Sequence, residues 1–381
     1  MTALTLTLMS APLTAQHRFG AVDAAVREGI TGGIYPGAVV VIGRADTVLY
    51  AKGYGRFTWS ASSAVPEPGS TLWDLASLSK VMGTASSIAA LAADNRVDLD
   101  APVSRYVPEF AGGAKDHVTV RMLLDHTSGL PPYARLYRSA TTGAAIAQLL
   151  AIPLQRKVGV EPLYSDLNAM LAGLIVERVS GQSLDTFAQA AVFAPLGLTA
   201  TMYRPALADR VRVVPTGRYR GTSLAGVVND ENARRLGGVA GHAGLFSTGM
   251  DVARFAQSWL RVTALSAPFA NGGTLMQFLE RSPSSGTRAL GWDTPSEPED
   301  GSPSVFGRCA TSGTFGHTGW TGTEVWIDRG QDLFVVFLTN RSYAPRRPST
   351  SITQLRLTRA KVSDAARRAV GSCVSGLKLF D

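Results

Sequence analysis

Ser77 and Lys80 are the residues of this sequence whose types and spacing best suit nucleophilic catalysis. They stand where an extended segment, residues 71–75, gives way to apolar residues at helical spacing that continue to about Asp94. Residues three apart share a helix face, so Lys80 can point at the Ser77 hydroxyl. A helix N-terminus also offers partial positive charge and free N–H groups, which stabilise a developing oxyanion. The pair therefore predicts acyl transfer through Ser77, with Lys80 as the nearby base.

Two further polar motifs follow along the chain. Tyr164-Ser-Asp166 stands just before a predicted helix, and His317-Thr-Gly319 stands beside the predicted C-terminal strands. The first pair is weak on its own, because the same Ser-x-x-Lys spacing recurs at Ser375-Gly-Leu-Lys378 without a strand-to-helix setting. Three motifs in a fixed order are far more specific than one.

In this order the motifs resemble those of the superfamily of class C β-lactamases, penicillin-binding proteins with DD-peptidase activity, and related esterases. That superfamily carries Ser-x-x-Lys, Tyr-x-Asn and Lys/His-Thr-Gly. Further segments resemble the same superfamily, at residues 123–130, 237–248, 316–323 and 338–341. The resemblance covers roughly residues 20–345.

The resemblance implies a role for each matching position. Ser77 is expected to be the nucleophile, Lys80 its base, and Tyr164 a second proton carrier that protonates the leaving group. The backbone N–H groups of Ser77 and Trp320 are expected to form the oxyanion hole, because in this superfamily one donor follows the third motif. The substrate's polar end is expected to meet the remaining motif residues, Asp166, His317, Thr318 and Gly319.

The sequence departs from the superfamily's pattern at two of these positions. Asp166 replaces the usual Asn, so an amide donor is exchanged for a carboxylate, which only accepts hydrogen bonds. This carboxylate should favour the charged ammonium of Lys80 and weaken Lys80 as a free base. His317 replaces Lys and is mostly uncharged at neutral pH, so a fixed positive anchor is lost. If the enzyme holds a substrate carboxylate, a protonated His317 has to supply the charge.

Other candidate residues have plainer interpretations. Ser79 lacks a lysine three positions later and is interpreted as a polar residue of the first helical turn. His126 is expected to be structural, whereas His242 could be packed or could line the cleft. The acidic loop 230–232 is expected to be a solvated turn, with a cleft edge that touches an amine-bearing substrate as the alternative. No histidine pair has zinc-ligand spacing, and no Gly-x-Ser-x-Gly elbow of an α/β-hydrolase is present.

Hydrophobic periodicity predicts the elements that would position these motifs. A helix over residues 19–30 is followed by two strands, over 37–44 and 46–53, which form a hairpin. A long helix starts at Ser77, and the stretch from 80 to 240 is mostly helical. The remaining predicted elements are helices at 167–179 and 250–260, strands at 322–328 and 333–339, and a closing helix at 356–370.

Strands at both ends of the chain, with helices between them, predict an α/β fold of the α+β sandwich type. Both chain ends are expected to form an antiparallel sheet flanked by helices, in a domain of residues 17–80 and 241–381. A mostly helical domain, residues 81–240, is inserted into it, with the active site between the two. This is the β-lactamase/transpeptidase-like architecture that the resemblance implies.

Composition narrows the partners and the compartment. The formal net charge is +8, but no zinc-finger spacing, RNP-like strand or long basic run is present, so nucleic-acid binding is not expected. The charge could favour peripheral contact with an anionic cell envelope. Residues 1–16 resemble a signal-peptide remnant or a disordered N-terminus, which favours a periplasmic or secreted bacterial protein. Cys309 and Cys373 could pair after export or remain free thiols.

Together these patterns predict a serine hydrolase that acts on a small-molecule or peptide acyl substrate, without a metal or organic cofactor. The favoured substrates are a D-alanyl peptide or a β-lactam, as for a DD-carboxypeptidase-like penicillin-binding protein. A carboxylesterase for short acyl esters is the first alternative, because such esterases share the three motifs. A catalytically silent binding protein of the same fold is the second alternative, and the intact Ser77, Lys80 and Tyr164 argue against it.

Overall fold

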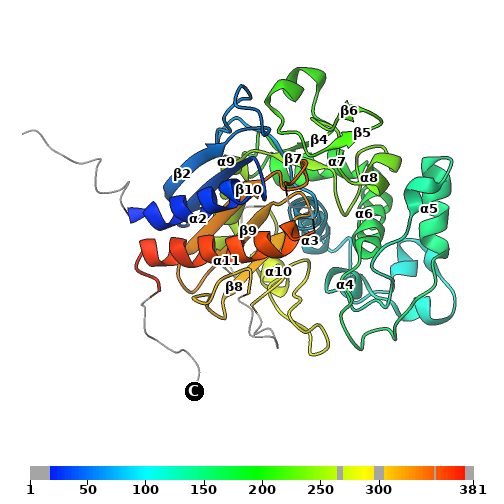
Figure 1. Ribbon diagram of the computed structural model, residues 1–381. Helices are drawn as coiled ribbons and strands as arrows, with labels where there is room; N and C mark the ends of the chain where they lie inside the picture. Colours follow the sequence, from blue (N-terminus) through cyan, green and yellow to red (C-terminus); the bar gives the residue numbers. More distant parts are fainter. Residues whose placement is uncertain (1–17, 264–268, 296–303, 347–348, 374–381) are drawn as a thin grey trace, which may run out of the picture.

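A five-stranded antiparallel sheet forms the centre of the computed structural model, which describes residues 18–263, 269–295, 304–346 and 349–373 (Figure 1). The strand order is β2-β1-β10-β9-β8. The N-terminal part supplies β1 (Gly37–Gly43) and β2 (Val48–Gly55). The C-terminal part supplies β8 (Thr314–Thr318), β9 (Glu324–Asp328) and β10 (Leu333–Thr339). Both chain ends therefore build one sheet, as the sequence predicts. The expected signal segment 1–16 lies outside the described residues.

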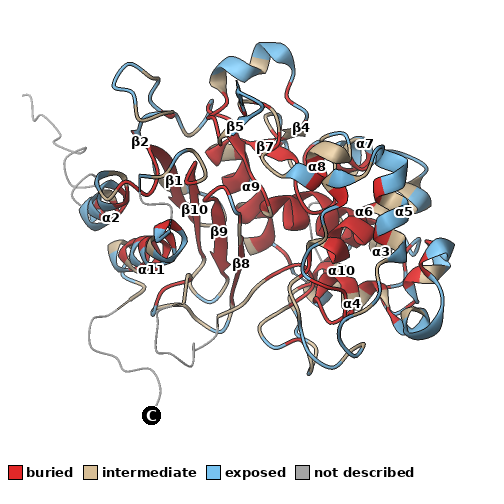
Figure 2. Ribbon diagram, turned by 45° about the vertical axis from the view of Figure 1, so that its right-hand side comes forward, coloured by how far each residue is buried: buried red, intermediate tan, exposed pale blue. Residues whose placement is uncertain are grey.

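Helices cover both faces of this sheet (Figure 2). α2 (Gly20–Thr31) and α11 (Ser351–Ala369) lie side by side on one face, and α9 (Gly249–Leu260) lies on the other. Strand residues alternate between the two cores, since Val40 packs with α2 and α11 whereas Val39 and Val41 pack with α9. The closing helix begins at Ser351, earlier than the predicted residue 356.

The middle of the chain is mostly short helices and loops. The element after Ser77 starts as a π-helical turn, η1 (Lys80–Ala85), and continues as α3 (Ser86–Ala93). The other helices are α4 (Val120–Leu124), α5 (Thr142–Ala151), α6 (Asp166–Ser180), α7 (Leu184–Ala188), η6 (Gln189–Phe193), α8 (Glu231–Arg235) and α10 (Gly272–Gln277). Short 3-10 turns are η2 (Val103–Arg105), η3 (Pro108–Phe110), η4 (Gly113–His117), η5 (Leu136–Arg138) and η7 (Leu207–Arg212).

A small three-stranded sheet links this middle part to the nucleophile's segment. Its order is β3-β7-β4, from β3 (Trp73–Asp74), β7 (Leu245–Ser247) and β4 (Met202–Tyr203). A separate hairpin, β5 (Arg218–Tyr219) and β6 (Thr222–Ser223), lies apart from both sheets. β3 ends shortly before Ser77, so the small sheet helps to fix where the predicted nucleophile stands.

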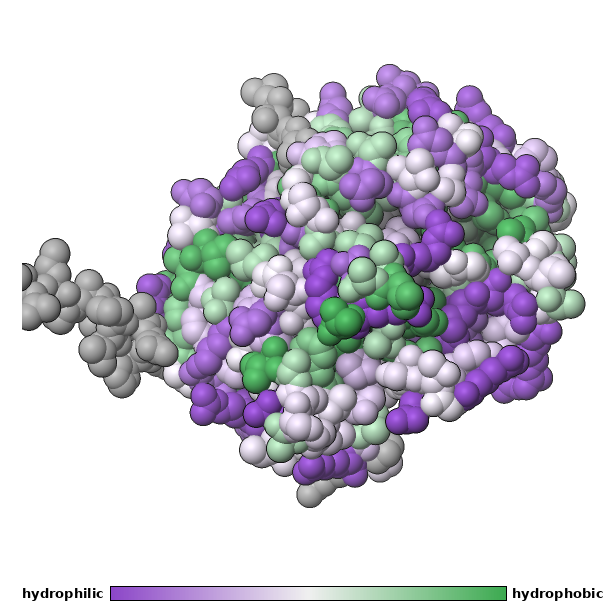
Figure 3. Space-filling model, turned by 90° about the horizontal axis from the view of Figure 1, so that it is seen from above, coloured by the Kyte–Doolittle hydropathy of each residue, from purple (hydrophilic) through white to green (hydrophobic). Residues whose placement is uncertain are grey.

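The outer surface is of mixed polarity. On the face seen from above, hydrophobic residues form small groups between hydrophilic ones (Figure 3). Within the described residues, no helix is both long enough and apolar enough to cross a membrane.

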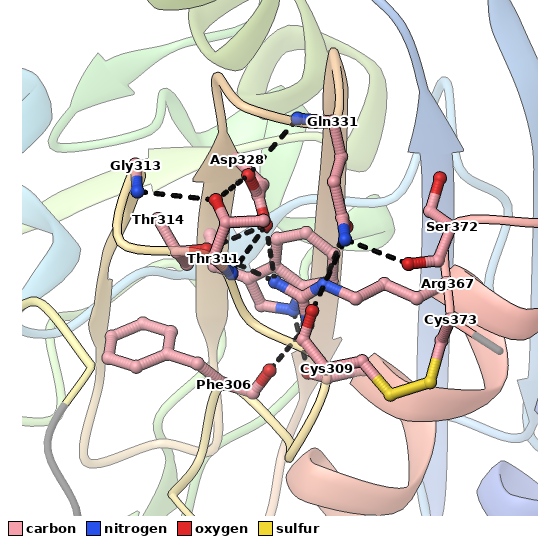
Figure 4. Close-up of polar contacts among 12 residues, drawn as sticks. Phe306, Cys309, Thr311, Gly313, Thr314, Asp328, Gln331, Arg367, Ser372 and Cys373 are labelled. Atoms are coloured by element: carbon pink, nitrogen blue, oxygen red, sulfur yellow. Dashed lines mark hydrogen bonds and ion pairs between the residues drawn. A yellow bond between two sulfur atoms is a disulfide. The ribbon is translucent and has the colours of Figure 1, made fainter. Parts of the chain in front are cut away.

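A disulfide closes the C-terminal part of the fold. Cys309 and Cys373 are joined, which resolves the alternative that the sequence left open (Figure 4). The bond ties the end of α11 to the segment that precedes β8.

Candidate active site

Ser77 lies at a strand-to-helix turn, as the sequence predicts. β3 ends at Asp74, and Ala76 adopts a left-handed φ of 47°. Asp74 Oδ1 accepts a hydrogen bond from the Ala76 N–H at 2.9 Å, which holds this strained turn in place. Lys80 lies on the next turn, and its Nζ donates to Ser77 Oγ at 2.8 Å. The predicted Ser–Lys pair is therefore in direct contact.

Ser79, the other hydroxyl of this turn, is occupied elsewhere. It is buried, and its Oγ accepts a hydrogen bond from the Leu245 N–H at 3.1 Å. This contact fastens the helix start to β7, in agreement with a structural role.

The Lys80 ammonium is surrounded by acceptors. Besides the bond to Ser77, Nζ donates to the His242 carbonyl oxygen at 3.2 Å and lies 2.7 Å from Asp166 Oδ1. Burial lowers the pKa of Lys80, but the attraction of Asp166 and of Tyr164 outweighs it, so this pKa lies above its ordinary value. In the resting protein Lys80 is thus a charged donor, the state that the Asp166 substitution was expected to favour.

Tyr164 lies where the three motifs meet. Lys80 Nζ is 5.1 Å from the centre of its ring. The ring centroids of His126 and His317 lie 4.7 and 5.9 Å away. The guanidinium carbon of Arg288 lies 5.0 Å from the same centre. The tyrosine expected to carry the second proton is therefore adjacent to the Ser–Lys pair and to the third motif.

His126 supports the second motif from behind. Its Nδ1 accepts a hydrogen bond from the Ser165 N–H at 3.2 Å and lies 3.2 Å from Asn168 Nδ2. Asn168 Oδ1 in turn accepts from Ser128 Oγ at 2.5 Å. Burial, together with the nearby Arg288 and Lys80, holds the pKa of His126 well below its usual range. The structural interpretation of His126 agrees with this network, which fixes the backbone beside Tyr164.

The third motif lies inside a strand that the sequence analysis did not anticipate. β8 is an edge strand of the large sheet and ends with His317 and Thr318. His317 is buried, and its Nδ1 lies 2.8 Å from the Thr318 carbonyl oxygen. Burial, Arg288 and Lys80 hold the pKa of His317 well below its usual range. The lowered pKa leaves His317 uncharged at neutral pH, so it lacks a fixed charge for a substrate carboxylate, and its substrate-binding role stays a prediction.

A turn after β8 brings the predicted second oxyanion donor to the nucleophile's segment. Thr321 Oγ1 donates to the Asp74 carbonyl at 2.7 Å, and Thr323 Oγ1 donates to the Leu75 carbonyl at 2.8 Å. Within the described residues, neither the Ser77 N–H nor the Trp320 N–H donates to a protein acceptor. Both predicted oxyanion donors are thus free to bind an oxygen of a substrate.

Gly319 is required for this close approach. A Cβ at this position would lie 2.2 Å from Thr323 Oγ1 and 2.6 Å from the Leu75 carbonyl oxygen. Any side chain would therefore push the turn away from the segment that carries Ser77, which explains the glycine of the third motif.

The buried His242 pairs with Asp230, whose side chain is 28% exposed. His242 Nε2 lies 2.7 Å from Asp230 Oδ1, which also accepts a hydrogen bond from the Ala233 N–H at 2.7 Å. Burial alone would raise the pKa of Asp230, but the attraction and hydrogen bond of His242 lower it below its ordinary value. Asp230 is the N-cap of α8 and is partly exposed, so loop 230–232 is the start of a helix where a solvated turn was expected. The pair supports the backbone carbonyl that binds Lys80.

Sequence reasoning missed Arg288. Its guanidinium lies over the Tyr164 ring and 3.5 Å from Asp293 Oδ2, and its charge contributes, with that of Lys80, to the lowered pKa of His317. Nothing in its sequence neighbourhood distinguishes it from the exposed Arg281. Across the described ranges, no three His, Cys, Asp or Glu side chains gather as a metal site.

Comparison with known proteins identifies the family. The Beta-lactamase family model matches residues 22–359. A protein of Escherichia coli (strain K12), named as a presumed D-alanyl-D-alanine carboxypeptidase, is 31% identical over 347 residues, which cover 82% of this chain and 80% of that protein. The N-acetylmuramyl-L-alanine amidase of Bacillus subtilis (strain 168) is 31% identical over 363 residues, 85% and 81% of the two chains. A solved penicillin-binding protein homolog from Caulobacter crescentus has a TM-score of 0.71 at 20% identity and covers 97% of this chain and 100% of its own.

The chain therefore belongs to the beta-lactamase family, and it is a serine hydrolase with the fold of that family. The match runs from α2 to α11, so it includes the sheet from both chain ends and the helical segment between them. The predicted family, fold class and enzyme class are confirmed. The roles of the individual site residues stay predictions.

Proposed function

We propose that the enzyme is a DD-carboxypeptidase-like hydrolase that forms an acyl-enzyme on Ser77. The observation that carries this proposal is the 2.8 Å hydrogen bond between Lys80 Nζ and Ser77 Oγ, at a turn where the N–H groups of Ser77 and Trp320 are free in the described part of the chain. A silent binding protein would have no need to keep this pair in contact.

The proton route follows from the contacts of Lys80. Nζ lies between Ser77 Oγ and Asp166 Oδ1, at 2.8 and 2.7 Å. Lys80 in its neutral form takes the proton from Ser77 Oγ, which attacks the carbonyl carbon, and Asp166 stabilises the ammonium that results. The two N–H groups stabilise the oxyanion, Tyr164 protonates the leaving group, and the Lys80 ammonium returns a proton to Tyr164. Water then hydrolyses the ester on Ser77 and releases the acid.

Arg288 favours a substrate that carries a carboxylate near the scissile bond. Its guanidinium lies 5.0 Å from the centre of the Tyr164 ring, so it can bind the terminal carboxylate of a D-alanyl peptide whose scissile bond lies at Ser77. The name of the Escherichia coli relative points to the same substrate class. β-Lactams carry a comparable carboxylate, so acylation by penicillin is part of the proposal.

A carboxylesterase is the second candidate function. The indole of Trp320 is 60% exposed at the mouth of the site, and the Asp166 carboxylate disfavours an anionic substrate nearby. Both features suit a neutral acyl ester.

We also place the enzyme in the bacterial envelope, because its segment 1–16 resembles an export signal and its relatives are bacterial.

The decisive experiment combines covalent labelling with a substrate screen. Wild type, Ser77→Ala and Ser79→Ala are tested on a D-Ala-D-Ala peptide, a chromogenic cephalosporin and a short p-nitrophenyl ester. We expect Ser77→Ala to abolish turnover and Ser79→Ala to retain it, with the peptide as the best substrate. Mass spectrometry after exposure to penicillin or a fluorophosphonate should place the adduct on Ser77. An adduct on another residue would overturn the mechanism, and turnover of the ester alone would favour the esterase.

A further inference from the structure

The peptide group between Gly319 and Trp320 is held from behind by a buried arginine. Its N–H is the predicted second oxyanion donor, and its carbonyl oxygen accepts a hydrogen bond from Arg359 Nη2 at 3.2 Å. The same nitrogen donates to the Thr323 carbonyl oxygen at 2.7 Å. Arg359 lies on α11 and is only 6% exposed. This guanidinium is too deeply buried to meet a substrate, yet it contacts the peptide that is expected to bind one.

Because the peptide group is planar, the hydrogen bond to its carbonyl oxygen also fixes the direction of its N–H. The Gly319–Trp320 peptide is trans, so its carbonyl oxygen and its N–H point in opposite directions within one plane. The carbonyl faces α11, and the N–H therefore points away from α11. Through Thr321 and Thr323, the same turn is hydrogen-bonded to the segment that leads to Ser77. Arg359 thus directs the N–H toward the nucleophile.

The positive charge of Arg359 also strengthens the N–H as a donor. A cation bonded to an amide oxygen draws electron density from the amide, so the N–H of the same group carries more positive charge. The effect is largest where water is excluded, as around this buried side chain.

A second arginine holds the next peptide. Arg341 Nε donates to the Trp320 carbonyl oxygen at 3.1 Å, and its guanidinium lies 4.5 Å from the centre of the indole. The carbonyl groups on both sides of the Trp320 N–H are therefore bound by arginines, which leaves the turn little freedom to rotate.

The register of α11 on the sheet keeps Arg359 in place. Residues 359, 363 and 367 are four apart and share one helix face. Ser363 Oγ accepts a hydrogen bond from Trp326 Nε1 at 2.7 Å. Arg367 Nη2 lies 3.1 Å from Asp328 Oδ2, within the polar network shown in Figure 4. The disulfide lies just beyond this network, so the whole end of the helix is fixed to β8 and β9.

We propose that Arg359 is a positioning residue of the oxyanion hole. It orients and polarises the Gly319–Trp320 peptide so that the Trp320 N–H meets the oxygen of the carbonyl under attack. The proposal rests on the proposed function, because it takes Ser77 and Trp320 as the two donors.

The test variants must avoid leaving a buried charge alone. Arg359 Nε lies 4.0 Å from Glu324 Oε2, and both side chains are buried. Removal of the arginine alone can prevent folding, because an unpaired buried charge is strongly destabilising. The main variant is therefore the double substitution Arg359→Met with Glu324→Gln. Glu324→Gln alone is the matched control, because it keeps both hydrogen bonds of Arg359; it leaves that arginine without its acidic partner, so its folding is verified by circular dichroism before the kinetics. Arg356→Met, an exposed change on the same helix, controls for the charge of α11.

Kinetics at pH 8 separate orientation of the donor from substrate binding. Removal of an oxyanion donor itself costs about 100-fold or more in kcat, so loss of its support should cost about 10-fold. We expect this loss in kcat with an unchanged KM, a smaller loss in Arg359→Lys, and none in the two controls. A boronic acid, which forms a tetrahedral adduct, should lose affinity by the same factor as kcat. A loss confined to KM, or a boronic acid that binds as in the wild type, would overturn the proposal.

An NMR measurement tests the peptide without any turnover. Protein labelled with ¹⁵N-tryptophan, with the Trp320 signal assigned from Trp320→Phe, should show an upfield shift of the Trp320 amide proton in the double variant. Glu324→Gln should leave that signal in place. An unmoved signal in the double variant would refute the positioning role. Failure to label Ser77 in the wild type would instead refute the proposed function, which keeps the two failures distinct.

Discussion

At the scale of single residues, the 2.7 Å contact between Lys80 Nζ and Asp166 Oδ1 sets the resting protonation of the site. Asp166 raises the pKa of Lys80 against the effect of burial, so Lys80 is charged below this raised pKa. If Lys80 has to accept the Ser77 proton, activity rises only as the pH approaches the pKa of Lys80. The carboxylate that stabilises the Lys80 ammonium thus also lowers the fraction of Lys80 that can accept the Ser77 proton.

Asp166→Asn tests whether Asp166 controls the protonation of Lys80. Because the substitution removes the negative charge, the pKa of Lys80 should fall, and the acid limb of the profile of kcat/KM against pH should move to lower pH. The measurement is this profile for a neutral ester, which avoids effects on substrate charge. Asp100→Asn, a change in the exposed ion pair with Arg121, should leave the limb in place. An unmoved limb in Asp166→Asn would mean that Lys80 is not the group that titrates.

Arg288→Ala separates substrate anchoring from chemistry. A charge-assisted hydrogen bond contributes about 1.5–3 kcal/mol, so KM for a D-Ala-D-Ala peptide should rise about 10- to 100-fold. KM for a neutral ester should change little, because the ester has no carboxylate to bind. The exposed Arg281→Ala provides the control for net charge in the same segment. Equal effects of Arg288→Ala on both substrates would exclude a carboxylate anchor.

The sequence predicted the residues that carry chemical motifs and missed those that act through position. Ser77, Lys80 and Tyr164 were found because their types and order form a pattern. Arg288 and Arg359 each reach the site from a segment that is distant in sequence, and neither belongs to a recognisable motif. The charge state of His317 also depends on burial, which only the packed structure reveals.

At the scale of elements, the predicted helices and strands agree with the structure where periodicity is strong. β1, β10 and α6 occupy almost the predicted ranges. β8 escaped prediction because Phe315 is its one large apolar side chain, so it shows no hydrophobic pattern, and its pairing with β9 decides its conformation. The π-helical turn η1 also gives no sequence signal, since its buried residues would suit an ordinary helix equally well.

The disulfide is predicted to stabilise the attachment of α11. Cys309→Ser with Cys373→Ser frees a loop of 64 residues, and the free energy of unfolding should fall by about 2–4 kcal/mol. Urea unfolding of the double variant and of reduced wild type should give the same loss. Ser372→Ala, beside the bond, controls for local packing. Unchanged stability would mean that the polar network around Arg367 fixes the helix without the disulfide.

At the scale of the whole molecule, buried histidines and buried acids change the free energy of unfolding in opposite directions as the pH falls. His126 and His317 stay neutral in the folded state, whereas in the unfolded chain they take up protons below about pH 6.5. They therefore lower the free energy of unfolding as the pH falls below that value. Burial raises the pKa of Glu324 to about 7 and that of Asp74 to about 6. As the pH falls, these two acids bind protons at a higher pH in the folded protein than in the unfolded chain. They therefore raise the free energy of unfolding as the pH falls toward about 4.

Glu324→Gln removes one of the two buried acids and leaves both buried histidines unchanged. Between about pH 6 and 5, the folded wild type holds a proton on Glu324 that the unfolded chain does not, and the variant lacks this group. The free energy of unfolding of Glu324→Gln should therefore fall with decreasing pH by about 1.4 kcal/mol per pH unit more than that of the wild type. Urea unfolding at constant ionic strength, from pH 7 down to pH 5, measures this slope. For Glu280→Gln, an exposed change, the free energy of unfolding should depend on pH as it does in the wild type. If Glu324→Gln also follows the wild type, Glu324 remains ionised in the folded protein at pH 5, paired with Arg359, and the histidines are balanced by Asp74 alone.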